Sequence, residues 1–118
     1  MKNILIVDDT EFMRRTLRDI LEEAGFNIVA EAENGVVAIE KYKMHTPDIV
    51  LMDITMPVMN GMEALKEIIK INNEAKVVIV SAMGQETIVR EAIMNGAEAF
   101  IVKPFKTERL VEVVTRLI

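Results

Sequence analysis

The stretch "ILIVDDTEFMRR", residues 4–15, places two adjacent carboxylates, Asp8 and Asp9, directly after four apolar residues. Such an apolar run is typical of a strand that is covered on both faces. Two like charges a few Å apart repel by about 4 kcal/mol at an effective dielectric constant of about 20, so the pair suggests a bound cation. Alternatively, the pair is a helix N-cap followed by an acid of the first turn, which stabilises a helix by about 1 kcal/mol. The rest of the chain must separate these interpretations.

Apolar runs alternate with helical spacing along the rest of the chain. Besides residues 4–7, nearly continuous apolar runs occur at residues 49–52, 77–80 and 100–102, and a weaker edge strand is expected at residues 27–32. Helical periodicity predicts helices at residues 13–24 (with Gly25 as the stop), 35–43, 62–71, 86–94 and 107–117. Parallel neighbours need long right-handed crossovers, so this alternation favours a parallel sheet with helices on both faces. We expect a doubly wound α/β sandwich.

Polar residues that could carry chemistry follow the predicted strands. Asp8 and Asp9 follow the first strand, Asp53 the third, Ser81 the fourth and Lys103 the fifth. In an open parallel sheet, ligands bind beyond the carboxyl ends of the strands, where the strand order reverses. We therefore expect these residues to meet at one edge of the sheet.

Three carboxylates, a hydroxyl and an ammonium together suit phosphoryl transfer. The carboxylates of Asp8, Asp9 and Asp53 are too few for a caged calcium ion but suit Mg²⁺, which keeps several waters and shares its shell with phosphate. Asp53 can act as the nucleophile and form an aspartyl phosphate, while the metal and Lys103 neutralise charge on the transferred oxygens. Ser81 can donate its hydroxyl to one phosphoryl oxygen.

The composition limits the remaining possibilities. The length of 118 residues fits one compact domain, residues 1–118, and no output domain is expected. The absence of cysteine excludes disulfides and a cysteine nucleophile, and it makes a cytoplasmic setting the default. A membrane span would need about 20 apolar residues, and no run approaches that length. The net charge of −5 opposes nucleic-acid binding.

Four motifs, "ILIVDD", "DIVLMDITMPVMNGMEAL", "VIVSA" and "AFIVKPF", resemble the receiver domain of two-component response regulators, and they occur in the family's order along the whole chain. The resemblance implies a flavodoxin-like (βα)5 fold with strand order 2-1-3-4-5. The opening "DDTEFMRRTLRDIL" and the expected lack of an output domain are similar to the single-domain chemotaxis regulators of this family. The resemblance also implies a monomer that catalyses only its own phosphorylation and dephosphorylation.

Carried over by position, the resemblance assigns a role to each site residue. Asp53 would be phosphorylated by a histidine kinase. Asp9 would bind Mg²⁺ directly, Asp8 mainly through water and Thr55 through its backbone carbonyl. The side chains that would bind the phosphoryl group are Ser81 and Lys103.

A switch is implied as well. Phe100 stands where the family keeps its switch aromatic, and Ser81 would draw the loop after the fourth predicted strand inward once Asp53 is phosphorylated. A cis bond between Lys103 and Pro104 would aim the lysine inward, as in the family. The surface that would change is formed by residues 86–94 and 99–117. Its expected partner is a flagellar or archaellar motor switch or adaptor protein, and a phosphatase is possible.

Other functions use similar parts. An aspartate-nucleophile phosphohydrolase needs a second aspartate two residues after the nucleophile, where this chain has Thr55. A flavin- or nucleotide-binding module needs a glycine-rich loop after the first strand, where this chain has an acidic pair. Within the receiver family, a stand-alone receiver of a non-chemotaxis phosphorelay stays an alternative.

Two further features have ordinary structural interpretations. His45, the only histidine, has no second ligand near it in the sequence and is expected at the surface. Four methionines near the predicted site are expected to fill gaps in the core and loops rather than to form a partner groove, namely Met52, Met56, Met59 and Met62.

Overall fold

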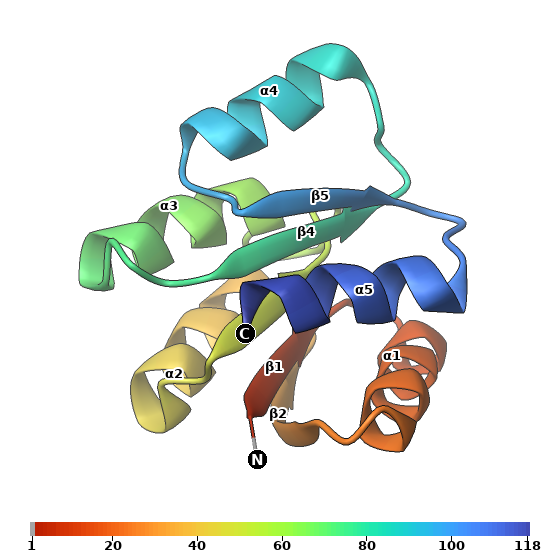
Figure 1. The fold of residues 1–118 in the computed structure, drawn as a ribbon. Coiled ribbons are helices and arrows are strands. Elements are labelled where there is room, and N and C mark those ends of the chain that lie inside the picture. Colours follow the sequence, from red (N-terminus) through yellow and green to blue (C-terminus); the bar gives the residue numbers. More distant parts are fainter. Residues whose placement is uncertain (1) are drawn as a thin grey trace.

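The computed structural model describes residues 2–118, in which a five-stranded parallel sheet lies between two layers of helices (Figure 1). The strands are β1 (Asn3–Val7), β2 (Asn27–Ala32), β3 (Ile49–Met52), β4 (Val77–Ser81) and β5 (Ala99–Val102). The helices are α1 (Glu11–Glu23), α2 (Gly35–His45), α3 (Gly61–Ile71), α4 (Glu86–Met94) and α5 (Thr107–Leu117). The strand order is β2-β1-β3-β4-β5. The predicted fold class and strand order are confirmed.

The ends of α1 show why its boundaries differ slightly from the periodic pattern. The helix begins before Met13 because the hydroxyl of Thr10 accepts a hydrogen bond from the Met13 N–H and caps the first turn. Thr10 is therefore the N-cap, and the interpretation of Asp8 and Asp9 as cap and first-turn acid is wrong. At the other end, Gly25 has φ 96°, a left-handed conformation that glycine adopts without steric cost, so it stops the helix as predicted.

Two hydrophobic cores, one on each face of the sheet, hold the layers together. Helices α1 and α5 cover one face, and α2, α3 and α4 cover the other (Figure 1). Strands β3 and β4 are buried throughout, and β1 is buried from Ile4 to Val7, as expected for nearly continuous apolar sequences. As predicted, Met52, Met56 and Met62 are buried, and Met59 packs against the same core. In the described part of the chain, no helix is both long and apolar enough to span a membrane.

Candidate functional site

The predicted site residues do meet at the carboxyl edge of the sheet. Strands β1 and β3 are neighbours with Val7 opposite Met52, so the residues that follow them, Asp8 and Asp53, emerge side by side. One carboxylate oxygen from each of Asp8, Asp9 and Asp53 lies within 4.8 Å of the others. We call these three residues the acidic cluster. It occupies the place where the strand order reverses, between β1 and β3.

Asp8 is held on both sides of its carboxylate. Its Oδ1 accepts hydrogen bonds from the Thr10 N–H at 2.9 Å and from the Thr10 hydroxyl at 3.0 Å. Its Oδ2 accepts from the Lys103 ammonium at 2.8 Å. The side chain is buried, whereas Asp9 is exposed, and no hydrogen bond within residues 2–118 uses the Asp9 carboxylate. Asp9 is thus the member of the cluster with free oxygens.

Lys103 bridges the two buried carboxylates. Its ammonium donates to Asp53 Oδ2 at 3.2 Å as well as to Asp8, while the Ile54 N–H donates to Asp53 Oδ1 at 2.7 Å. The peptide bond between Lys103 and Pro104 is cis, as the family resemblance implied.

The charges in this bridge shift two pKa values. Burial raises the pKa of the Asp53 carboxyl, with Lys103 opposing the shift and Asp8 adding to it. Burial alone would lower the pKa of the Lys103 ammonium, but the hydrogen bond to Asp8 and the negative charges nearby outweigh it, so that pKa is raised. Lys103 therefore stays charged and compensates part of the repulsion between the aspartates.

Strand β4 and the loop after β3 supply Ser81 and Thr55, which form the hydroxyl side of the site. Ser81 is the last residue of β4 rather than the first after it, and it is buried. Its oxygen accepts a hydrogen bond from the Met83 N–H at 3.1 Å, so the hydroxyl hydrogen is available for another acceptor. Across the mouth of the site, the Thr55 hydroxyl contacts Met83 Sδ at 3.3 Å. The β3–α3 loop and the β4–α4 loop thus contact each other.

Phe100 lies on β5, opposite Ile79 of β4, and is half-buried. It packs against the core shared with Met83 of the β4–α4 loop and Ile88 of α4. The aromatic ring therefore shares a core with the loop after Ser81 and with α4.

The loop from β3 to α3 folds tightly back over Asp53. The Gly61 N–H donates to the Ile54 carbonyl at 2.8 Å. A Cβ at Gly61 would lie 1.8 Å from the Asp53 carbonyl oxygen, so only glycine allows this approach. In the same loop Val58 has φ 68°, a strained conformation for a β-branched residue. The backbone around Asp53 is thus fixed by close packing.

The acidic cluster fits Mg²⁺ by its donor chemistry. All three side chains offer hard carboxylate oxygens, and together with the Lys103 ammonium they leave two formal negative charges, which one Mg²⁺ would balance. His45 contributes nothing here: it ends α2 with intermediate exposure and belongs to no cluster of metal-binding side chains within residues 2–118.

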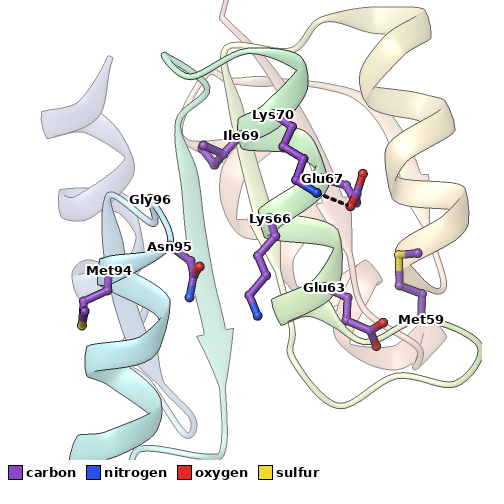
Figure 2. A pocket seen from close by; sticks show the side chains of 9 residues that line it. All are labelled: Met59, Glu63, Lys66, Glu67, Ile69, Lys70, Met94, Asn95 and Gly96. Atoms are coloured by element: carbon purple, nitrogen blue, oxygen red, sulfur yellow. Dashed lines mark hydrogen bonds and ion pairs between the residues drawn. The ribbon is translucent and has the colours of Figure 1, made fainter.

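A separate groove lies away from the acidic cluster, between α3 and α4, with a volume of about 600 Å³ (Figure 2). Its lining combines apolar side chains, such as Ile69 and Met94, with charged ones, such as Lys66 and Glu67. The groove therefore separates α4 from its neighbour in the same layer.

Sequence reasoning missed three residues that shape the site, namely Thr10, Arg14 and Gly61. The short spacing Asp8-Asp9-Thr10 is a signal for a turn in which an aspartate accepts backbone hydrogen bonds. Gly61 was visible only as part of an Asn-Gly turn. The Arg14 NH1 group donates to the Asp8 carbonyl at 2.7 Å. Nothing in the sequence distinguishes Arg14 from the other arginines of α1.

Comparison with known proteins identifies the class. A model of the response regulator receiver domain matches residues 4–115, and the chain belongs to this family. The chain is therefore a regulator of two-component signalling, and such receiver domains are generally regulatory rather than catalytic.

Within the family, the chain is similar to chemotaxis proteins. It is 56% identical to the chemotaxis protein CheY of Bacillus subtilis (strain 168), over 96% of this chain and 94% of that protein. It is 55% identical to CheY of Thermotoga maritima, over 98% of this chain and 97% of that protein. The structure of a CheX-CheY-BeF3-Mg complex from Borrelia burgdorferi matches with a TM-score of 0.96 and 40% identity, covering 98% of this chain and 88% of that one.

Proposed function

We propose that the chain acts as a chemotaxis-type response regulator in which Asp53 accepts a phosphoryl group from a histidine kinase. The observation that carries the proposal is the arrangement around Asp53. Its buried carboxylate belongs to the acidic cluster and accepts a hydrogen bond from Lys103 at 3.2 Å. An oxygen nucleophile, a fixed cation and further carboxylates for a metal are the parts that phosphoryl transfer to a carboxylate requires.

The reaction follows from these groups. A carboxylate oxygen of Asp53 attacks the phosphorus of a phosphohistidine, the new O–P bond forms as the P–N bond breaks, and the imidazole keeps the bonding electron pair. Lys103, which bridges Asp8 and Asp53, can donate a hydrogen bond to a phosphoryl oxygen. Ser81 has a hydroxyl hydrogen free for another such oxygen.

The metal site in this proposal is formed by Asp9, Asp53 and the backbone carbonyl of Thr55, with Asp8 acting mainly through water. When bound, Mg²⁺ supplies charge neutralisation for the phosphoryl oxygens. The ranking of the two N-terminal aspartates is supported by their contacts. Asp8 already accepts three hydrogen bonds, whereas Asp9 is exposed with free oxygens.

The output of phosphorylation is a change in the surface made by α4, β5 and α5. A phosphoryl oxygen on Asp53 would attract the Ser81 hydroxyl and draw the β4–α4 loop inward. Phe100, Met83 of that loop and Ile88 of α4 all pack against the same hydrophobic core, so a shift of the loop would change the space open to the Phe100 ring. Tightly packed apolar groups favour discrete arrangements, which makes Phe100 a two-state element.

The partners follow from the similarity to chemotaxis proteins. The kinase is of the chemotaxis type, and the output partner is a flagellar or archaellar motor switch or adaptor protein. A phosphatase that removes the phosphoryl group is a further expected partner. A partner that stabilises the switched surface must, by reciprocity, also favour phosphorylation of Asp53.

The first prediction tests the nucleophile. Incubation with acetyl phosphate and Mg²⁺ is expected to add one phosphoryl group, detected by mass spectrometry and removed by hydroxylamine, as an acyl phosphate should be. Asp53→Asn is expected to lose this labelling entirely, and omission of Mg²⁺ to suppress it. The control is Asp19→Asn, which removes an exposed aspartate of α1. Normal labelling of Asp53→Asn would overturn the assignment.

The second prediction tests the metal ligands. Loss of a direct ligand should weaken Mg²⁺ binding more than loss of a residue that acts through water or hydrogen bonds, whose removal costs about 10- to 100-fold in affinity. Asp9→Ala is therefore expected to weaken Mg²⁺ binding more than Asp8→Ala in a calorimetric titration. Equal losses would contradict the ranking.

A further inference from the structure

Arg14 of α1 connects three elements near the acidic cluster. Its NH1 donates to the Asp8 carbonyl at 2.7 Å, and its Nε donates to Glu31 Oε1, on β2, at 3.1 Å. The side chain is 17% exposed, so the guanidinium is largely shielded from water. One side chain therefore ties the start of α1 to the end of β1 and to the edge strand.

The carbonyl that Arg14 contacts belongs to the peptide bond between Asp8 and Asp9. Because a peptide unit is planar, a hydrogen bond to its oxygen fixes the orientation of the whole unit, including the nitrogen of Asp9. The preceding peptide is also fixed, since the Asp8 N–H donates to the Ala32 carbonyl at 3.0 Å. The exposed Asp9 side chain has no hydrogen bond of its own in the described residues, so its direction depends on this backbone.

Glu31 keeps Arg14 in place. Its Oε1 accepts from Arg14, and its Oε2 accepts from Arg18 Nε at 2.7 Å. Arg18 in turn donates to Glu22 at 3.1 Å. The network restricts the rotamers of Arg14, so little further entropy is lost in holding the Asp8 carbonyl.

We infer that Arg14 is a positioning residue for the metal site, which fixes the Asp8–Asp9 peptide and thereby orients the Asp9 carboxylate. The inference rests on the proposed function, because it takes Asp9 as a direct ligand of Mg²⁺.

Charge and geometry make opposite predictions for Arg14. A guanidinium repels a divalent cation, so the loss of its charge alone would tighten Mg²⁺ binding. Loss of positioning would weaken Mg²⁺ binding, because the Asp9 carboxylate would have to be ordered when the ion binds. The sign of the change therefore separates the two roles.

The experiment compares Arg14→Met with Arg18→Met in the full chain. Both variants remove a cation and a hydrogen bond to Glu31, but only Arg14 contacts Asp8. By calorimetric titration with MgCl₂, Arg14→Met is expected to bind about tenfold more weakly, and Arg18→Met within about twofold of the parent chain. The Asp9 amide resonance is expected to shift in Arg14→Met before any metal is added. The labelling rate of Arg14→Met with acetyl phosphate should recover at saturating Mg²⁺.

A second, more conservative variant tests the role of Arg14 even if Arg14→Met folds poorly. Arg14→Lys keeps the charge and the aliphatic stem but has no planar fork to reach the Asp8 carbonyl and Glu31 together. It is expected to show most of the loss in Mg²⁺ affinity at unchanged charge. Parent-like affinity in Arg14→Lys, or an unchanged or tighter affinity in Arg14→Met, would overturn the inference.

The outcome for the proposed function is read separately. If the parent chain binds no Mg²⁺, or if Asp53→Asn is labelled normally, the proposed function fails and the role of Arg14 fails with it. If the parent chain binds Mg²⁺ and Asp53→Asn is not labelled, equal behaviour of Arg14→Met and Arg18→Met overturns the positioning role alone.

Discussion

Helices α1 and α4 both begin at the carboxyl edge of the sheet, on opposite faces, yet they are held very differently. Helix α1 has a side-chain cap from Thr10, two fully buried leucines and ion pairs to Glu31 of the neighbouring strand. Helix α4 has no side-chain hydrogen bond at its N-cap, Gln85, and Ala92 is its one buried residue in the structure described. A wide groove also separates α4 from α3 (Figure 2).

The difference teaches how one site can be both firm and responsive. Asp8 is held by Thr10, the cap of α1, and by Lys103, so its carboxylate needs little reorganisation in the proposed site. The loop after Ser81 leads into α4, which has little buried surface to resist a shift. We expect the chemistry to be positioned by the firm side and the signal to leave through the weakly packed side.

The largest expected effect is on the free energy of unfolding, when core contacts of α1 or of α4 are removed. Leu17 of α1 is 1% exposed, so Leu17→Ala is expected to lower the free energy of unfolding by about 2–5 kcal/mol. Ile88 of α4 is only partly buried, and Ile88→Ala is expected to lower it by about 1 kcal/mol. Urea unfolding followed by circular dichroism measures both. Equal losses would show that α4 is as firmly packed as α1.

A smaller effect is expected at the two helix starts. Thr10→Ala removes the cap and the hydroxyl bond to Asp8, and is expected to lower the free energy of unfolding by about 1 kcal/mol. Gln85→Ala removes no capping bond and is expected to change it by less than about 0.5 kcal/mol. The same urea titration applies. A larger loss for Gln85→Ala would reverse the comparison.

The smallest expected effect is a change in amide chemical shifts, which also shows which residues respond. Addition of beryllofluoride with Mg²⁺, as a phosphoryl analogue, is expected to shift resonances across residues 86–117 and to change those of residues 14–23 little. Asp53→Asn is the control and should show no such shifts. Changes confined to the pocket around Asp53, with none across residues 86–117, would contradict the proposed switch through Phe100.

Much of the fold could be predicted because every strand except the edge strand β2 is a short apolar run followed by polar residues. The buried strands β3 and β4 have nearly continuous apolar sequences, and the residues after them point to the shared edge. Because ligands bind beyond the carboxyl ends of parallel strands, the strand positions alone predict that Asp8, Asp53 and Lys103 lie together. The roles of these residues in phosphoryl transfer stay predictions that the experiments above test.

The remaining details depend on contacts between distant parts of the chain. The bridge from Lys103 to Asp8 joins residues 95 positions apart, and local sequence carries no sign of it. The Asn-Gly dipeptide before α3 predicts a turn, but the approach of Gly61 to the Asp53 carbonyl depends on how α3 packs. The sequence leaves the cap of α1 open because aspartate and threonine are both good caps, and only the geometry of Thr10 decides between them.

The ammonium of Lys103, placed between Asp8 and Asp53, also has a consequence for biosynthesis. The chain carries a counter-ion of its own for its buried carboxylates, so a newly made molecule can reach its native state before any divalent ion binds. Under the proposed function, a cell short of magnesium would then lose the signal before it lost the folded protein.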